Sequence, residues 1–311
     1  MNGIPLVEKY GYFLKDLLAA SIAPDVITTD NVYQEANLES RKFMKLMMKE
    51  NLLEGSKING LENFHEFYDL VKSGKRGLIL SEHFSNMDLP AYCYMLEEYG
   101  EGFGKDLSLS TVAIAGMKLN EVNPAVKAWA EAFSRVVIYP SRSLKAHESQ
   151  ADFDAEMEKS KKINMAAMRA MDVCKKNGHP ILVFPSGTRY RPNKPETRTG
   201  LREIDSYLRT FDYMILVSIN GNCLRINPEN PEDMTQDLVT KDTIILSASP
   251  VIECRKFRKE AMASLSDDVE DKKSAVVQKV MDALTSQHDE HQAEYKAAYK
   301  AATGQESDYY A

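Results

Sequence analysis

The chain has 311 residues, 43% of them hydrophobic, and its 39 Lys and Arg against 46 Asp and Glu give a formal net charge of −7 at pH 7. This composition excludes a disordered, collagen-like or disulfide-framed chain. The acidic balance also argues against a nucleic-acid-binding protein, which needs a dominant basic face. At about 150 residues per domain, the length favours two domains over one.

The N-terminal segment and the cysteines bear on the compartment. Segment 12–23 is partly apolar, but Lys15 and Asp16 interrupt it, so it predicts an amphipathic helix rather than a signal peptide. No apolar run approaches the roughly 18 residues that span a bilayer. The four cysteines form no Cys-x-x-Cys pair and are expected to pack in the core as reduced thiols. These features predict a soluble cytoplasmic protein and leave room for a transient contact with a membrane surface.

Residues 1–75 are expected to be helical throughout. The segments 32–53 and 61–71 place large apolar side chains at helical spacing. The Met-rich part of the first segment could form an adaptable lipid-facing surface, but a packed interface between helices is the favoured interpretation. Gly74 and Gly77 then interrupt the helical pattern, and a different pattern of apolar residues begins.

Short apolar runs alternate with longer amphipathic segments beyond residue 75. The Val, Ile and Leu content of the runs is typical of buried strands, and the intervening segments are typical of helices. This alternation predicts an α/β fold with a mixed, largely parallel sheet flanked by helices. We expect a small N-terminal helical domain at 1–75 and an α/β domain with C-terminal helices at 76–311. The predicted strands are 77–81, 110–115, 136–139, 181–184, 214–219 and 243–247.

The segment 267–302 predicts a charged helix or a pair of helices. It carries His288 and His291 with Asp289 and Glu290 between them, a set that could ligate a metal ion. Because no third ligand is indicated, a solvated helix face is the favoured interpretation, and we expect no metal site.

Ligands of α/β sheets bind where strands end and helices begin, and two predicted strand ends carry polar residues. After the strand at 77–81 the chain reads Glu-His83-Phe-Ser-Asn-Met-Asp88, a polar turn that leads into a helix. In such a turn Asp88 can hold one ring nitrogen of His83 as a donor and leave the other free as a base. His147 and Asp152 have the same spacing but lie in a polar segment, so His83 is the favoured candidate.

The second strand end is the turn Pro185-Ser-Gly-Thr-Arg189-Tyr-Arg191-Pro192. The two arginines are two residues apart, so in an extended loop both guanidinium groups project to the same side. Together they could hold a phosphate dianion, to which the planar guanidinium group is well matched. A surface loop with two solvated arginines is the alternative.

These two loops resemble those of the glycerol-3-phosphate 1-acyltransferases, in particular the soluble, plastid-type branch. The wider glycerolipid acyltransferase superfamily shares a His-x4-Asp block, matched here by His83 and Asp88, and a later Pro-x-Gly-Thr-Arg block, matched from Pro185 to Arg189. The soluble branch typically has Pro-Ser-Gly-Gly-Arg-x-Arg-Pro, which this chain follows except at Thr188. The segment Ile114-Ala-Gly116 and the strand at 137–139, with the basic residues that follow it, also look like that branch. The resemblance covers roughly residues 60–255.

The resemblance implies a role for each matched residue. His83 and Asp88 are the catalytic pair by this likeness, and Arg189 and Arg191 bind the substrate phosphate, with Gly187 in the same substrate-binding turn. No metal belongs to the pattern, and no cofactor is expected beyond the acyl donor, which is a substrate.

The family also places a Lys-His pair directly after the strand at 137–139 as further phosphate ligands, and the chain departs from that pattern. Lys145 and His147 are the nearest equivalents, and Arg142 competes with them for this role. A second departure lies in the strand at 214–219, which lacks the family's proline, so nothing is carried over from it. Thr188 moves its block towards the superfamily consensus, which leaves the choice of acceptor open.

By this resemblance the chain is expected to transfer a fatty acyl group from acyl carrier protein or coenzyme A to the sn-1 hydroxyl of glycerol 3-phosphate, in the first step of phospholipid synthesis. Since the thioester is already activated, His83 needs only to take the proton of the hydroxyl. Two alternatives stay open: acylation of 1-acylglycerol 3-phosphate, and a non-catalytic protein that binds phospholipid or phosphate. A serine hydrolase is disfavoured because no Gly-x-Ser-x-Gly turn is present.

Both acyl donors are anionic, so charge does not choose between them. Either one needs a local basic surface on this acidic chain, although most such clusters are solvated faces. The candidate clusters are Arg41/Lys42/Lys45, Lys72/Lys75/Arg76 and Lys159/Lys161/Lys162.

Overall fold

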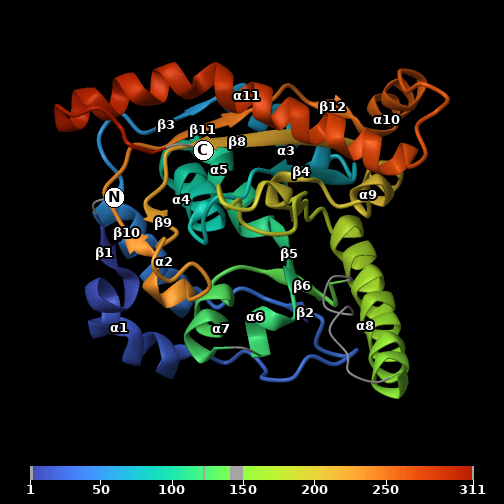
Figure 1. Cartoon of the computed structure of the whole chain (residues 1–311), viewed down its shortest axis with the longest axis horizontal. Coiled ribbons are helices and arrows are strands. Elements are labelled where there is room, and N and C mark those ends of the chain that lie inside the picture. Colours follow the sequence, from blue (N-terminus) through green and yellow to red (C-terminus); the bar gives the residue numbers. More distant parts are fainter. Residues whose placement is uncertain (1–2, 122, 141–149, 310–311) are drawn as a thin grey trace.

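A mixed β-sheet is the central feature of the computed structural model, which describes residues 3–121, 123–140 and 150–309. Within these ranges nine strands form the sheet, eight of them in the order β2-β6-β5-β7-β4-β8-β11-β3, with β12 paired to β8. The five neighbours from β6 to β8 all run parallel. Helices flank the sheet, so the predicted α/β fold with a mixed, largely parallel sheet is confirmed (Figure 1).

All six predicted strands are present, with ends that differ from the prediction by at most two residues. Leu80 of β4 is in register with Val183 of β7 on one side and with Leu216 of β8 on the other. Every residue of β4 is buried, which explains why this strand is a continuous apolar run rather than an alternating one. The strands are β4 (Gly77–Ser81), β5 (Val112–Gly116), β6 (Arg135–Ile138), β7 (Ile181–Val183), β8 (Tyr213–Asn220) and β11 (Ile245–Ala248).

The two edges of the sheet come from the segment that was expected to be all helix. β2 (Tyr33–Gln34) is antiparallel to β6, and β3 (Lys57–Asn59) is parallel to β11. The prediction that residues 1–75 are helical throughout is therefore wrong, because strands of two and three residues are too short to show an alternating pattern. The division into domains at 1–75 and 76–311 stays a prediction.

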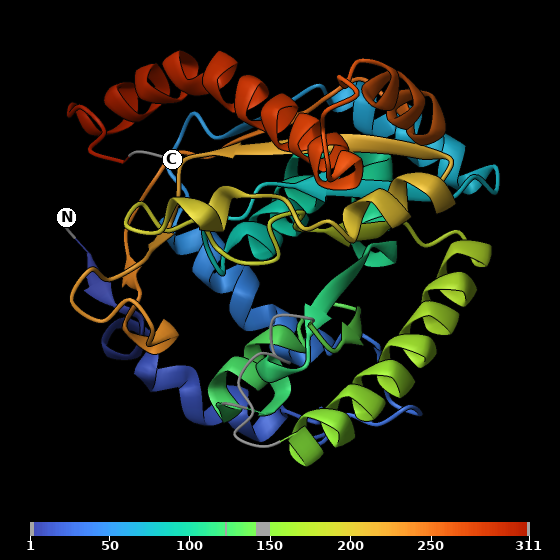
Figure 2. The ribbon, with the colours of Figure 1, turned by 45° about the vertical axis from the view of Figure 1, so that its right-hand side comes forward.

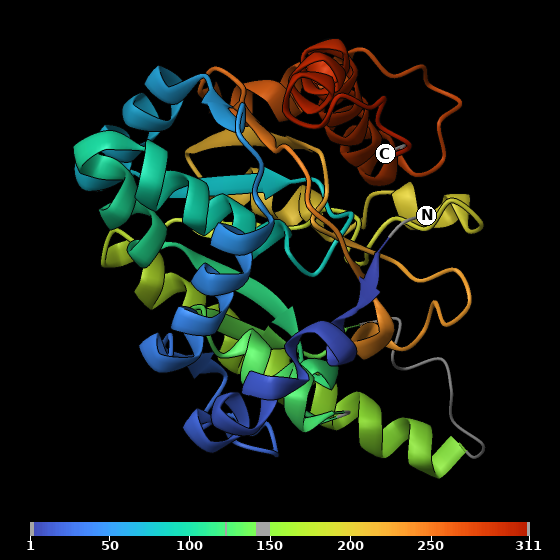
Figure 3. The same cartoon turned by 90° about the vertical axis from the view of Figure 1, so that its left-hand side faces the viewer.

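Helices cover both faces of the sheet, as Figure 3 shows. Buried residues of α1–α5 and α7 form one apolar core, and those of α8–α11 form a second core on the other face. Alternate residues of β4 enter the two cores: Ile79 enters the first, and Leu78 and Leu80 enter the second. The helices are α1 (Leu6–Ala20), α2 (Leu38–Asn51), α3 (Leu61–Lys72), α4 (Asp88–Tyr99), α5 (Glu101–Ser110), α6 (Lys118–Glu121), α7 (Pro124–Ala130), α8 (Gln150–Lys176), α9 (Ile204–Thr210), α10 (Cys254–Ala263) and α11 (Lys272–Thr303). The long α8 runs along one side of the molecule (Figure 2).

A small three-stranded sheet lies beside the loop that follows β4. Its middle strand, β10 (Leu238–Val239), pairs antiparallel with both β1 (Ile4–Pro5) and β9 (Leu224–Arg225). The hydroxyl of Ser85, four residues after β4, donates a hydrogen bond to the carbonyl of Leu224 at 2.8 Å. The small sheet is thereby tied to the loop that carries His83.

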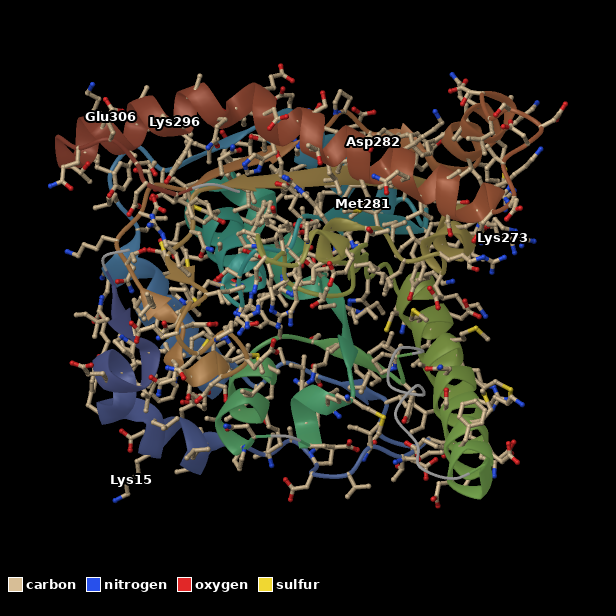
Figure 4. All side chains as sticks on the ribbon, viewed as in Figure 1. Lys15, Lys273, Met281, Asp282, Lys296 and Glu306 are labelled. Carbon is tan, nitrogen blue, oxygen red and sulfur yellow. The ribbon has the colours of Figure 1, made fainter. Side chains whose placement is uncertain are left out.

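The C-terminal segment forms one long helix, α11, over the second core (Figure 1). Its buried residues, such as Met281 and Leu284, alternate with exposed ones such as Lys296, and Figure 4 labels one of each kind, Met281 and Lys296. The prediction that His288 lies on a solvated helix face is wrong. His288 is 1% exposed and hydrogen-bonded to Glu82, so it belongs to the inner face of α11.

Two expectations drawn from composition can be compared with the fold. All four cysteines are buried and unpaired, as predicted. In the ranges that the structure describes, no helix combines the length and the apolar character that crossing a membrane requires.

Candidate active site

The loop between β4 and α4 brings His83 and Asp88 together. Oδ2 of Asp88 lies 2.9 Å from Nδ1 of His83. The same oxygen accepts the backbone N–H groups of Phe84 and Ser85, at 2.6 and 2.8 Å. Asp88 is buried at the first position of α4, where the helix dipole favours a negative charge. The carboxylate is thus fixed by its neighbours in one orientation, behind the imidazole ring.

The imidazole of His83 is accessible on its other edge. Its side chain is 17% exposed, and Nε2 makes no hydrogen bond to any residue within the described ranges. When Nδ1 carries a proton for Asp88, Nε2 holds a lone pair and can take a proton from a bound hydroxyl group. This is the arrangement that the spacing of the two residues predicted.

The two loops singled out in the sequence meet at adjacent strand ends. β7 lies beside β4, and Phe184, which follows β7, stacks on the ring of His83 with 4.0 Å between ring centroids and 13° between ring planes. The backbone N–H of Tyr190 donates to the carbonyl of His83 at 2.8 Å. The arginine loop is therefore fastened to the histidine loop through both a ring contact and the main chain.

Gly187 shapes the arginine loop. Its φ of +63° lies in the left-handed region, and its N–H donates to the carbonyl of Phe184 at 2.9 Å to close a tight turn. A Cβ atom at this position would lie 2.3 Å from Cδ1 of Leu201. The backbone conformation and the close approach of Leu201 therefore both favour glycine at position 187.

Arg189 is buried and engaged with a carboxylate that the sequence analysis did not single out. Its guanidinium group forms an ion pair with Asp237, and the side chains of the two residues are 5% and 0% exposed. Asn86, in the histidine loop, donates a long hydrogen bond of 3.5 Å to the same carboxylate oxygen. Burial raises the pKa of Asp237 to about 6, although the charge of Arg189 acts in the opposite direction.

Arg191 lies nearer the surface and has weaker partners. Its Nη1 is 3.4 Å from the hydroxyl of Thr188, and its Nη2 is 3.5 Å from Glu232, a residue whose side chain is 68% exposed. Lys194 binds the same glutamate at 2.9 Å. Because its partners are distant or solvated, the charge of Arg191 is available to an anion at lower cost than that of Arg189.

A third arginine lies beside the loops and was missed. The guanidinium carbon of Arg198 is 4.9 Å from the ring centroid of Tyr190 and 6.0 Å from that of Phe84, within cation–π range. Nothing in the sequence around Arg198 distinguishes it from other surface arginines. The same holds for Asp237, because its partner Arg189 is 48 residues away along the chain.

The other predicted phosphate ligands lie outside the described residues. Arg142, Lys145 and His147 all fall in segment 141–149, so their role stays a prediction. The strand that was expected to precede them is present as β6.

Among the residues that the structure describes, no group of three or more His, Cys, Asp or Glu side chains is placed to hold a metal ion. A cavity of about 440 Å³ lies between the N-terminal strand and the end of α11. Its lining includes the cations Arg225 and Lys241 and the acids Glu306 and Asp308, so its charges balance and it shows no preference for an anion.

The comparisons with known proteins do not assign the chain to a family. No protein-family model matches the chain, and no curated protein matches its sequence. The function is therefore argued from the residues of the two loops and from their arrangement.

Proposed function

We propose that the protein transfers a fatty acyl group from an acyl thioester to the sn-1 hydroxyl of glycerol 3-phosphate, giving 1-acylglycerol 3-phosphate. The observation that carries this proposal is the His83–Asp88 pair beside a loop with two arginines. The pair supplies a base with an accessible Nε2, and the loop supplies positive charge for an acceptor that carries a phosphate group.

The chemistry requires no covalent intermediate. His83 Nε2 takes the proton of the sn-1 hydroxyl while its oxygen attacks the thioester carbon, so that a C–O bond forms. The buried carboxylate of Asp88 stabilises the imidazolium that results. The tetrahedral intermediate collapses with cleavage of the C–S bond, and the imidazolium returns the proton to the leaving thiolate. His83 ends the cycle in its starting state.

The phosphate of the acceptor is assigned to the arginine loop. Arg191 offers a guanidinium group that forms an ion pair with the exposed Glu232 at 3.5 Å, and an incoming phosphate can replace that contact. Arg189 adds positive charge that is shared with Asp237. A basic residue of segment 142–147 completes this proposed phosphate site, and Lys145, His147 and Arg142 are the candidates for it.

The acyl donor is coenzyme A or acyl carrier protein. Of the three basic clusters, Arg41 and Lys45 pair with Glu97, and Lys72 pairs with Asp106. Arg76 pairs with Asp212, Lys159 with Glu156 and Lys162 with Glu158. Each cluster therefore contains cations that are already paired, and these contacts do not choose the surface on which the donor binds.

Thiol release is the direct assay. Acyl-CoA and the acylated form of acyl carrier protein are each supplied with glycerol 3-phosphate, with 1-acylglycerol 3-phosphate, with glycerol, or with no acceptor. The proposal predicts release that depends on glycerol 3-phosphate and is weak with glycerol, which lacks the phosphate. Equal release without an acceptor indicates a thioesterase, a preference for 1-acylglycerol 3-phosphate indicates the second acylation, and no release with binding of unchanged ligand indicates a non-catalytic protein.

A further inference from the structure

A fully buried carboxylate precedes His83 in the chain. Oε2 of Glu82 lies 2.8 Å from Nδ1 of His288 on α11, and the side chains of Glu82 and His288 are 6% and 1% exposed. The two residues are 206 positions apart in the sequence. A buried glutamate is costly unless it is paired, and burial raises the pKa of Glu82. Because burying the Glu82 carboxylate costs free energy and the residue is adjacent to the proposed catalytic base, we asked what the pair does for His83.

Glu82 is the residue at which the chain leaves the sheet. Its backbone N–H continues the parallel ladder by donating to the carbonyl of Val217 at 3.1 Å. In a regular ladder, the carbonyl of Glu82 would then accept the N–H of Ile219. Instead the side-chain oxygen Oε2 of Glu82 accepts that N–H, at 3.0 Å. The carboxylate therefore replaces the residue's own carbonyl, and the main chain is free to turn away at His83.

His288 contacts Glu82 and Phe84, the residues before and after His83 in the sequence. It hydrogen-bonds Glu82 on one side, and its ring meets the ring of Phe84 edge-on, with centroids 5.4 Å apart. The backbone N–H of Phe84 is one of the two that orient Asp88. The alternation of β4 places Glu82 on the same face as Leu78 and Leu80, towards α11. Helix α11 thus contacts the residue before and the residue after the catalytic base.

We propose that Glu82 and His288 are positioning residues that fix the point at which the chain leaves β4, and thereby the placement of His83 against Asp88. Neither residue touches substrate. This inference rests on the proposed function for its kinetic consequence, but its structural consequence, an ordered loop at Phe84 and Ser85, is independent of the reaction.

Three variants test the role of Glu82. Glu82→Gln keeps an oxygen that accepts the N–H of Ile219, whereas Glu82→Leu fills similar space and accepts nothing. Gln292→Leu is the matched control, because Gln292 also bonds α11 to β8, through Asn220 at 2.8 Å, without touching Glu82. The measurements are kcat and KM for glycerol 3-phosphate, and hydrogen-exchange protection of the amides of Phe84 and Ser85.

The expected result is a loss of turnover without a matching loss of affinity. Glu82→Leu lowers kcat about 100-fold and leaves KM within about twofold, because the base is displaced, whereas the guanidinium group assigned to the phosphate is a side chain of another loop. The same variant lowers protection of the two amides about tenfold or more. Glu82→Gln retains most of the activity and protection, and Gln292→Leu retains both.

The outcomes separate this inference from the proposed function. Wild-type protection of Phe84 and Ser85 in a folded Glu82→Leu variant overturns the positioning role. Absence of acyl transfer by the wild-type protein overturns the proposed function, and the exchange measurement then still decides the positioning role. Should Glu82→Leu fail to fold, His288→Phe replaces it, since phenylalanine keeps the ring contact with Phe84 and removes the hydrogen bond. Unchanged kcat and unchanged protection in His288→Phe overturn the inference as well.

Discussion

Oδ2 of Asp88 lies 2.9 Å from Nδ1 of His83 and also accepts two backbone N–H groups, from the residues that follow the histidine. One oxygen atom therefore orders the loop and orients the imidazole of His83. The two roles can be separated by substitution, because an amide oxygen can still accept N–H groups while it carries no charge.

Asp88→Asn and Asp88→Ala are expected to differ in stability more than in activity. Both lower kcat by about 100-fold or more, since neither can stabilise the imidazolium of His83 with a negative charge. Only the alanine variant leaves the N–H groups of Phe84 and Ser85 unpaired, and it loses about 1–3 kcal/mol more in the free energy of unfolding. Urea titrations and initial rates check the two effects. Wild-type turnover in the asparagine variant contradicts the role of the charge.

Arg191→Ala is expected to weaken the binding of the acceptor. Loss of a charge-assisted bond to phosphate raises KM for glycerol 3-phosphate about tenfold or more, and kcat falls less. Lys194→Ala is the control, because Lys194 binds the same Glu232 at 2.9 Å but is not assigned to the phosphate. Equal KM values for Arg191→Ala and the wild-type protein count against the proposed phosphate site.

Gly187→Ala is expected to lower stability through backbone strain and a steric clash. The φ of +63° and the 2.3 Å approach to Leu201 together cost about 2–4 kcal/mol in the free energy of unfolding. Gly178→Ala is the matched control: its φ is +73°, but the nearest atom to its Cβ is 3.8 Å away, so it costs only about 1–2 kcal/mol. Equal losses in the two variants, measured by urea unfolding, contradict the clash with Leu201.

Asp237 is expected to make stability depend on pH. The pKa of its carboxyl is raised from 3.8 to about 6 in the fold, so the folded protein binds more protons than the unfolded chain between those values. The stability that protonated Asp237 contributes is present below about pH 4 and is lost as the pH rises through 6, by about 3 kcal/mol in total.

The comparison with Asp237→Asn isolates this effect, because asparagine does not titrate. The free energy of unfolding of the wild-type protein, minus that of the variant, is expected to fall between about pH 4 and 6 and to be flat above pH 7. A difference that rises with pH over this range indicates a lowered rather than a raised pKa for Asp237.

Local patterns were enough to predict six of the strands and the two loops, because each of these features depends on a few neighbouring residues. β4 is a continuous apolar run, and His83 and Asp88 are separated by a single turn. Contacts between residues that are far apart in the sequence produce no local pattern from which they could be predicted. Asp237 meets Arg189 across 48 positions, and Glu82 meets His288 across 206.

The error at His288 has an identifiable cause. The solvated face was favoured because no third metal ligand is indicated in this charged segment, whose residues Asp289 and Glu290 are exposed in the structure. However, His288 is four residues after Leu284 and seven before Tyr295, both of them buried, so helical periodicity puts it on the inner stripe of α11. Periodicity along the helix was the better guide than the charge of adjacent residues.

The measurement that tests the central claim most directly is the rate of thiol release in the presence of glycerol 3-phosphate, for the wild-type protein and for His83→Ala. The account predicts a kcat that falls by about 10²–10⁴-fold, with affinity for glycerol 3-phosphate nearly unchanged. His65→Ala, which removes an exposed histidine on α3, is expected to leave the rate unchanged. A rate in His83→Ala within about twofold of the wild-type rate contradicts the assignment of His83 as the base.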